Sequence, residues 1–278
     1  MSEEPRVIIV VSKPDIASML QFEILRDSFG FVETGEILFS NPIYARDNVR
    51  IVQINEPSIL STEVQSLEGD LLIFASKHVS QAGMKAVLVH TPGVWTDDVS
   101  HGGLPYKISL APANELKYGF DRLVFHAQDN CLDDFNVGIE VTHHGPILPE
   151  IPAIYVEQGG TKEEWQHQKA AETVAATIYD IAQAFSAQAI PRKKAIVGFG
   201  GNHYCARFLK LVATEDYAFG HIIPKHVLDR TRPEMIHEAW ARTLAQEKIA
   251  VIDKKGTKSA HRNMIREQLA TITDIVFR

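Results

Sequence analysis

The 278-residue sequence predicts a layered α/β domain built around a mostly parallel or mixed sheet. Short runs of apolar and β-branched residues alternate with helical patterns along the whole chain. Several of these runs are apolar at nearly every position, as expected for strands that are covered on both faces. The chain has no internal repeat, no low-complexity tract and no evident linker. We therefore expect residues 1–278 to form a single domain.

The strands and the first helix can be placed in order along the chain. "RVIIVVS" at 6–12 is a continuous apolar run that predicts a covered strand. A helix should follow, because Asp15 is a suitable N-cap, apolar residues recur at helical spacing, and Gly30 is a suitable stop. The remaining expected strands are 49–54, 70–76, 85–90, 137–143, 153–158, 194–200, 219–223 and 248–253.

Three further helices are expected in the second half of the chain. The clearest runs from about Thr161 to Phe185, where Thr161 and Glu164 have the spacing of a capping box and an apolar stripe follows. The second spans about 233–247, with a proline that is tolerated in its first turn. The third covers 259–272.

The overall charge is acidic. A net charge of −7 and a pI near 5.9 argue against nonspecific binding of polyanions, which depends on clustered Lys and Arg. Two local basic clusters remain, "PRKK" at 191–194 and "DKKGTKSAHR" at 253–262. Such clusters are usually solvated loops or helix ends.

The compartment is predicted from what the chain contains. Cys131 and Cys205 form neither a disulfide framework nor a CxxC pair, which fits a reducing cytosol. The opening "MSEEPRVIIVVSKPD" is acidic and its apolar run has only the length of a strand, so we expect no signal peptide. No run reaches the roughly 18 apolar residues of a membrane span. We expect a cytoplasmic protein.

Histidines gather where a binding site is expected. In open α/β sheets, ligands bind beyond the carboxyl ends of the strands. Six candidate residues fall at or just after such ends: His90, His101, His143, His144, Glu157 and His203.

The segment "VTHHGP" at 141–146 raises a question of geometry. Successive side chains on a strand point to opposite faces, so His143 and His144 can serve one site only if the chain turns there. Gly145 and Pro146 supply a turn signal. Histidines with Glu157 form a donor set that suits a divalent metal such as zinc. Alternatively, Glu157 forms a structural salt bridge.

A glycine-rich turn, "VGFGGNHYCARF" at 197–208, is the second candidate segment. Gly200 and Gly201 allow the backbone to approach a ligand closely, Asn202 offers an amide, and His203 offers a base or a metal ligand. The alternative is a strand-to-helix turn in which Asn202 caps the helix. His221, in the apolar run "FGHII", is most simply a core histidine.

Read together, these segments resemble the archaeal and plant type of D-aminoacyl-tRNA deacylase. The resemblance depends on "KAVLVHTPG" with "HGG", on "VTHHGPILPEIPAIYVEQGGTKEEW", on "VGFGGNHYCARF" and on "GHIIPKH". They occur in the family's order and the likeness covers essentially the whole chain. The long THHGP and GGNHY blocks are the specific ones.

The resemblance implies hydrolysis of the ester that joins a D-amino acid to the 3′ end of tRNA. It also implies Zn²⁺ dependence and a three-layer α/β/α fold like that of the phosphorylase/peptidyl-tRNA hydrolase group. We expect a monomer whose partner is tRNA carrying a D-amino acid, held mainly by its 3′ end through local basic clusters and stacking on aromatic side chains.

The family's functional positions transfer onto matching residues of this chain. The resemblance implies catalytic roles for His143, His144, Glu157, Asn202 and His203. It implies that Thr142, Gly200, Gly201, Tyr204 and His101 contact the substrate. It implies metal ligands among His143, His144, His203 and His221. At 91–95 the chain reads "TPGVW" where we expect "TGN" after the histidine, so no role is carried over to His90.

Several alternatives stay open from the residues alone. The histidines either bind zinc or act without metal as a general base and substrate grip. The amides of 198–202 are candidates for stabilising an oxyanion. The rival functions are a zinc-dependent amidohydrolase or peptidase acting on a small substrate, and a nucleotide-binding protein without hydrolytic chemistry.

Overall fold

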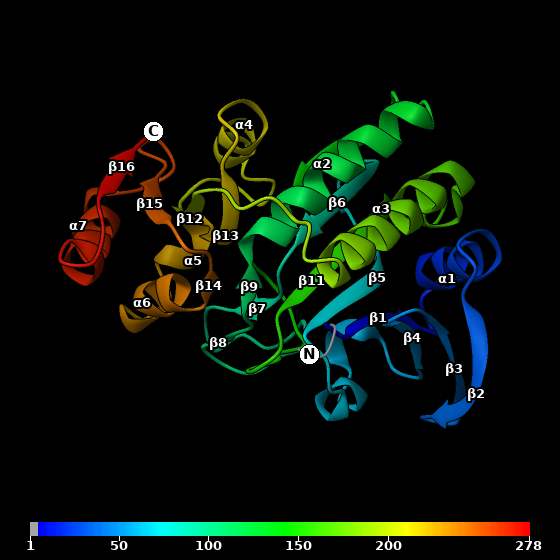
Figure 1. The fold of residues 1–278 in the computed structure, drawn as a ribbon. Helices are drawn as coiled ribbons and strands as arrows, with labels where there is room; N and C mark the ends of the chain where they lie inside the picture. The colour runs from blue at the N-terminus through cyan, green and yellow to red at the C-terminus, as the bar shows by residue number, and fades with distance from the viewer. Residues whose placement is uncertain (1–4) are drawn as a thin grey trace.

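The computed structural model describes residues 5–278 and is built on a mixed eight-stranded sheet (Figure 1). The strand order is β10-β6-β11-β5-β1-β4-β3-β2. The strands of this sheet are β1 (Val7–Ser12), β2 (Val32–Leu38), β3 (Asn41–Arg46), β4 (Val49–Ile54), β5 (Leu71–Val79), β6 (Ala86–His90), β10 (Asn136–Ile139) and β11 (Ala153–Gly160). β4, β1, β5 and β11 are mutually parallel, and β6 is antiparallel to β11. The prediction of a mostly parallel or mixed sheet is confirmed.

A second, smaller sheet is formed by the C-terminal part of the chain. Its strands are β12 (Ala195–Phe199), β13 (Ala218–Ile223), β15 (Lys248–Ile252) and β16 (Ile275–Phe277), in the order β13-β12-β15-β16. All neighbours are parallel. Two short pairs complete the strands, β7 (Gly93–Val94) with β8 (Lys107–Ile108) and β9 (Ala111–Pro112) with β14 (Thr243–Leu244).

The two faces of the large sheet are covered differently. Helices α1 (Ile16–Ser28), α2 (Ala113–Asp129) and α3 (Gln168–Ser186) lie together on one face (Figure 1). The other face is covered by the 3₁₀ turns η1 (Ser58–Leu60) and η2 (Glu63–Ser66) and by the loop at 147–152. The 3₁₀ turn η3 (Glu164–Gln166) joins β11 to α3 and contacts α1. The remaining helices belong to the C-terminal part: α4 (Ala206–Thr214), α5 (Lys225–Leu228), α6 (Glu234–Ala241) and α7 (Ser259–Leu269).

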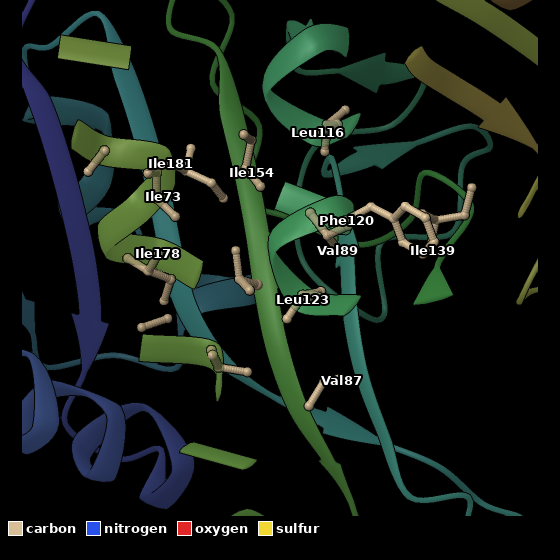
Figure 2. Close-up of a cluster of buried hydrophobic side chains, with 14 of the residues drawn as sticks. Ile73, Val87, Val89, Leu116, Phe120, Leu123, Ile139, Ile154, Ile178 and Ile181 are labelled. Carbon is tan, nitrogen blue, oxygen red and sulfur yellow. The ribbon is translucent and has the colours of Figure 1, made fainter. Parts of the chain in front are cut away.

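Strand alternation explains the continuous apolar run of β1. Val7, Ile9 and Val11 pack beneath the three helices. Ile8 and Val10 point to the opposite face and pack with the 3₁₀ turns. Figure 2 shows the helical side of this core, where Leu116 and Phe120 of α2 and Ile178 and Ile181 of α3 meet residues of β5, β6 and β11. Because both faces of β1 are buried, as predicted, both its odd-numbered and its even-numbered side chains must be apolar.

One apolar cluster extends from the large sheet to the small one. It includes Ile139 at the end of β10, Ile196 of β12 and Phe208 of α4, and α2 contacts both β6 and β13. The single-domain interpretation of residues 1–278 remains a prediction. None of the helices in the described residues is long and apolar enough to cross a membrane.

Several element boundaries differ from those predicted. The expected helix at 161–185 begins at Gln168, because Glu164 accepts from the backbone and hydroxyl of Thr161 within a separate 3₁₀ turn, and His167 caps the helix. The helix expected to reach 247 ends at Ala241, and that expected to reach 272 ends at Leu269. α4 is preceded by Cys205 in a left-handed conformation, so the alternative of Asn202 as its cap is wrong.

Candidate active site

The candidate site lies on the face of the large sheet that the helices leave uncovered. On β5, His78 shares the parity of Leu72 and Phe74, which pack against the 3₁₀ turns. On β11, Glu157 shares the parity of Tyr155. His90 of β6 is paired with Tyr155, so its imidazole lies diagonally across from Glu157 on the same face. Three neighbouring strands thus deliver ionisable side chains to one place.

The two adjacent histidines reach this place because the strand ends early. β10 stops at Ile139 rather than at 143 as predicted, and the chain then runs between the two sheets: the amide of Val141 donates to the carbonyl of His203 (3.1 Å) and that of Thr142 to Ile222 (3.1 Å). His144 adopts a left-handed backbone with φ 45°, which breaks the alternation of side chains. The rings of His143 and His144 consequently lie 4.4 Å apart, centroid to centroid.

Backbone carbonyls orient three imidazoles in the same way. The Nδ1 atoms of His143 and His144 lie 2.8 Å from the carbonyl of Val141 and 2.6 Å from that of Gly145. Nδ1 of His90 lies 3.3 Å from the carbonyl of Thr91. A carbonyl can only accept, so each Nδ1 carries the proton and each Nε2 presents a lone pair. Second-sphere carbonyls of this kind fix the tautomer of metal-binding histidines.

Two carboxylates are buried among these rings. The side chain of Glu157 is 4% exposed; its Oε1 lies 3.7 Å from His90 Nε2 and 3.8 Å from His144 Nε2, and its Oε2 lies 3.6 Å from His78 Nδ1. The side chain of Glu140 is fully buried. A buried carboxylate is costly unless it is paired, ligated or hydrogen-bonded. The salt-bridge alternative for Glu157 stays open, but its partners would be three histidines and not a single cation.

Glu140 is the less satisfied of the two. Its Oε1 lies 2.7 Å from Nε2 of His203 and 3.5 Å from Nδ1 of His78. Within residues 5–278, neither oxygen of Glu140 makes a hydrogen bond of acceptable geometry, and neither does the buried Nε2 of His90. Buried polar atoms that converge without protein partners are suited to binding a cation.

Mutual electrostatics set the charge states in the cluster. Burial alone would raise the pKa of Glu157, but its contacts with His144, His78 and His90 hold that pKa well below the usual range. Burial, reinforced by the neighbouring imidazoles, lowers the pKa of His143 well below its ordinary value. Burial also lowers the pKa of His144. At neutral pH, Glu157 is therefore ionised. His143 and His144 are neutral and can donate a lone pair to a metal ion.

The carboxylates act in the opposite direction on two histidines. Burial favours the neutral form of His78, but Glu157 and Glu140 outweigh it and raise the pKa of His78. The same balance raises the pKa of His90. In both, the attraction of the carboxylates for the protonated imidazole outweighs the cost of burying its charge.

The donor set fits a divalent metal ion. Three overlapping groups have their ligand atoms within 4.8 Å of one another: His90 with His143 and His144, Glu140 with His143 and His203, and His78 with Glu140 and Glu157. Imidazole nitrogen and carboxylate oxygen are the ligands that zinc takes in catalytic sites. The orphaned atoms of His90 and Glu140 belong to these groups.

The cluster opens into two cavities that share one wall. The larger, of about 940 Å³, lies between η1, the end of β5 and Tyr204. The smaller, of about 190 Å³, lies between Trp95, Thr142 and α5. Five residues line both cavities: His101, His143, His144, His203 and His226. Glu157 and His78 line the larger one.

Seven of the predicted site residues lie in the cluster or on the walls of the cavities. His143, His144, Glu157 and His203 lie together in the cluster, as the sequence predicted. Tyr204 lines the larger cavity, and its hydroxyl is 3.2 Å from Nε2 of His78. Thr142 and His101 line the smaller cavity.

Within the glycine-rich turn, Gly200, Gly201 and Asn202 line neither cavity, unlike His203 and Tyr204. The N–H of Gly200 donates to the carbonyl of Ile223 (2.8 Å) and is not available to an oxyanion. A Cβ at Gly200 would lie 2.9 Å from the carbonyl oxygen of Gly256, so this glycine permits contact with a neighbouring loop. Gly201 and Asn202 line neither cavity. We therefore leave these three residues out of the proposed site.

His221 lies apart from the candidate metal groups. It is fully buried, its Nδ1 is 3.0 Å from the hydroxyl of Thr142, and its Nε2 is 3.0 Å from the carbonyl of Ser109. Both ring nitrogens are thus occupied by protein atoms. Burial lowers the pKa of His221 to about 3. The environment is that of a neutral core histidine, and we leave it out of the proposed ligands.

Sequence reasoning missed Glu140 and His226, assigned no role to His78, and placed His90 at a strand end without carrying a role over to it. Glu140 precedes the THH segment inside a run expected to be a strand, and no local pattern separates it from a solvent-facing residue. His78 and His90 follow apolar strands, which is the available signal, but both need β11 beside them to become part of a cluster. His226 becomes visible only once α5 is placed at the cavities.

Comparison with known proteins is consistent across sequence and structure. Residues 65–275 match the sequence profile of the D-aminoacyl-tRNA deacylase family. A D-aminoacyl-tRNA deacylase from Thermococcus kodakarensis is 31% identical, with 93% of this chain and 94% of the relative covered. One from Methanosarcina barkeri is 30% identical, with 96% and 88% covered. A crystal structure of a conserved protein of unknown function superposes with a TM-score of 0.87 at 26% identity, covering 98% and 95% of the two chains.

Proposed function

Because the chain belongs to the D-aminoacyl-tRNA deacylase family, it hydrolyses the ester bond of D-aminoacyl-tRNA, and we propose that the Glu140–Glu157 cluster is where it does so. The observation that carries this assignment is convergence: two buried carboxylates and the Nε2 atoms of several histidines meet at the wall shared by two cavities. The amidohydrolase and peptidase alternative is not favoured by the relatives.

We propose that the cluster holds a divalent ion, with zinc as the best match to its nitrogen and oxygen donors. His90, His143 and His144 would hold it through Nε2, with Glu140 as the carboxylate ligand, which leaves Glu157 and His203 for proton transfer. When bound, zinc would supply a Lewis acid that stabilises negative charge on the ester carbonyl and acidifies water.

The protein's own side chains account for the proton movements. Hydrolysis joins a water oxygen to the ester carbon and breaks the bond to the ribose oxygen, and the water's proton must reach that leaving oxygen. Glu157 is ionised because three histidines contact it, so it can accept a proton from water. The imidazole of His203 is 38% exposed and is held by Glu140, so it faces the substrate and can donate to the leaving oxygen.

The substrate enters through the larger cavity in this proposal. Its volume of about 940 Å³ has room for an amino acid and a terminal nucleoside, whereas about 190 Å³ has not. Tyr204 on its wall offers a ring for stacking and a hydroxyl near His78. We also propose that the enzyme acts as a monomer in the cytoplasm, where its substrate is made and where its two unpaired cysteines stay reduced.

The test is hydrolysis of D-tyrosyl-tRNA against L-tyrosyl-tRNA, with and without a strong chelator and with zinc added back. We expect turnover of the D-ester alone, lost on chelation and restored by zinc. D-selective turnover that is unaffected by the chelator would support the function and contradict the proposed role of zinc. Failure to hydrolyse either ester, with zinc present, would overturn the function.

A further inference from the structure

We infer that a basic surface beside the cavities binds the phosphates of the tRNA 3′ strand; this inference rests on the proposed function. The surface, which we call the basic rim, consists of Lys225, Arg230, Arg232, Lys254, Lys255 and Lys258. These residues come from the segments at 224–233 and 253–258, which follow β13 and β15.

Topology places these segments at the mouth of the site. β12, β13 and β15 are parallel neighbours, so the loops that follow them meet at one edge of the small sheet. The loop after β12 carries His203, and the segment after β13 carries His226; both histidines line the two cavities. The rim therefore borders the site that would hold the ester.

Direct contacts join the three loops into one surface. The amide of Lys225 donates to the carbonyl of Gly201 (3.0 Å). A Cβ at Gly256 would lie 2.3 Å from the amide nitrogen of Gly201, so the backbone beside Lys255 packs directly on the same turn. Lys225 and Lys255 are thereby held on either side of the turn that leads to His203. This close packing gives the backbone of Gly201 a structural role in joining the loops.

The rim is positively charged although the molecule as a whole is negatively charged. Its two segments contain six Lys and Arg and two Asp, a local net charge of +4 in a chain of net charge −7. Clustered cations of this kind are the electrostatic footprint of a nucleic-acid backbone. A polyanion approaching an acidic protein is repelled elsewhere and attracted here, next to the cavity that its 3′ end must enter.

Three of the lysines have no charged partner in the part of the chain that the structure describes. Lys258 is held by Asp229 (2.7 Å), Arg230 lies 3.4 Å from Asp97, and Arg232 stacks over the ring of Tyr106. Among residues 5–278, the ammonium groups of Lys225, Lys254 and Lys255 make no ion pair and all three side chains are exposed. These three are available to phosphates.

The other basic cluster is placed differently. "PRKK" at 191–194 precedes β12, so it lies at the opposite edge of the small sheet, five strand residues away from the turn with His203. At roughly 3.3 Å per residue this separates the two clusters by more than about 15 Å. Lys193 is also paired with Asp216. This cluster cannot border the cavities and provides a matched control.

The experiment compares two double variants that each remove two exposed positive charges. Lys254→Ala with Lys255→Ala alters the rim; Arg192→Ala with Lys194→Ala alters the other cluster. The substrates are D-tyrosyl-tRNA and 2′(3′)-O-D-tyrosyl-adenosine, which keeps the ester and the terminal nucleoside but has no phosphate. We expect the rim variant to lose about tenfold in kcat/KM on tRNA, through KM, because phosphate contacts contribute to binding and not to chemistry.

The small ester distinguishes the loss of phosphate contacts from damage to the active site. Its hydrolysis should be unchanged in both variants, and the control variant should act on tRNA as the wild type does. An unchanged KM for tRNA in the rim variant, an equal loss in the control variant, or an equal loss on the small ester would overturn the inference. If the wild type hydrolyses neither substrate, the proposed function fails. The affinities of the two variants for uncharged tRNA then test, independently of hydrolysis, whether the rim binds phosphates.

Discussion

At the scale of single residues, the site depends on what each imidazole nitrogen contacts. His143, His144 and His90 donate through Nδ1 to backbone carbonyls and keep Nε2 for the centre of the cluster. His221 has both nitrogens engaged by protein oxygens and contributes packing alone. The same residue type therefore has two roles in one molecule, decided by the second nitrogen's partner.

Removing a central imidazole should abolish turnover without unfolding the protein. We expect His144→Ala and His203→Ala each to lose more than about a hundredfold in kcat on D-tyrosyl-tRNA, the loss typical of a general acid/base group. His237→Ala, an exposed histidine outside both cavities, is the control and should keep wild-type kcat. Circular dichroism would show that all three variants remain folded. Wild-type turnover in both site variants would refute the site assignment.

His221 should make the fold sensitive to acid. Its pKa in the folded protein is about 3, well below the roughly 6.5 of an unfolded chain. Between these values the unfolded chain binds a proton that the folded protein does not, so stability falls as pH falls through this window and is unaffected above it. By pH 4.5 the loss should reach about 2 to 3 kcal/mol.

The measurement is urea unfolding of the wild type and His221→Gln from pH 7.5 to 4.5. The variant loses hydrogen bonds to Thr142 and Ser109 and should be less stable at pH 7.5. It lacks the titrating group, so the stability gap should close as pH falls. Parallel curves for the two proteins would contradict the prediction.

At the scale of elements, the strands that could be predicted are those buried on both faces, because these have continuous apolar sequences. β1 was recognisable because Val7, Ile9 and Val11 pack on one side and Ile8 and Val10 on the other. β2 was missed because nearly all of its residues are exposed, so no apolar period marks it. α2 was missed because it starts after Pro112 without a side-chain cap and contains Gly119.

The candidate site was predictable to the extent that its residues follow strands. "VTHHGP" gave His143 and His144 because a turn signal follows the strand pattern immediately. Glu140 could not be recognised, since its contact with His203 joins residues from two different sheets. The substrate contacts expected of Gly200 and Gly201 stay predictions, because glycine permits close approach of any backbone, and the neighbour of Gly200 here is Gly256.

Gly119 sits where α2 packs against α3, and it provides a test of that packing. A Cβ at Gly119 would lie 2.9 Å from Cδ1 of Ile181, the atom that faces it from α3. Alanine should gain about 1 kcal/mol of helix propensity, but overpacking costs about 1 to 3 kcal/mol. We expect Gly119→Ala alone to lower the unfolding free energy by about 1 kcal/mol, as measured by chemical denaturation.

Ile181→Val supplies the matched background because it removes Cδ1 and retains the rest of the side chain. In that background the added Cβ keeps two contacts, at 3.5 Å to Cγ2 of Val89 and at 3.6 Å to Cγ1 of residue 181, and both are ordinary van der Waals distances. Gly119→Ala should then stabilise by up to about 1 kcal/mol. A change of the same sign in both backgrounds would mean that the helix interface is not limited by this contact.

At the scale of the whole molecule, the site needs both sheets. The large sheet supplies His78, His90 and Glu157, and the small sheet's loops supply His203 and His226. Glu140 and the two adjacent histidines lie on the segment that crosses from one sheet to the other. An acidic molecule thus carries the Glu140–Glu157 cluster, its proposed catalytic site, at a junction, with a basic rim along one side of the opening.

This charge distribution predicts a shallow dependence of activity on salt. A contact with a single-stranded phosphate changes the logarithm of affinity by about −0.7 per tenfold rise in salt, so the three unpaired lysines of the rim should give a slope near −2. We expect log(kcat/KM) on D-tyrosyl-tRNA to fall with that slope in KCl. The Lys254→Ala, Lys255→Ala variant keeps one such lysine and should give a slope near −0.7. A slope of −6 or steeper, as for an extensively basic binder, would require phosphate contacts far beyond the rim, and a slope of zero would leave tRNA recognition to the cavity alone.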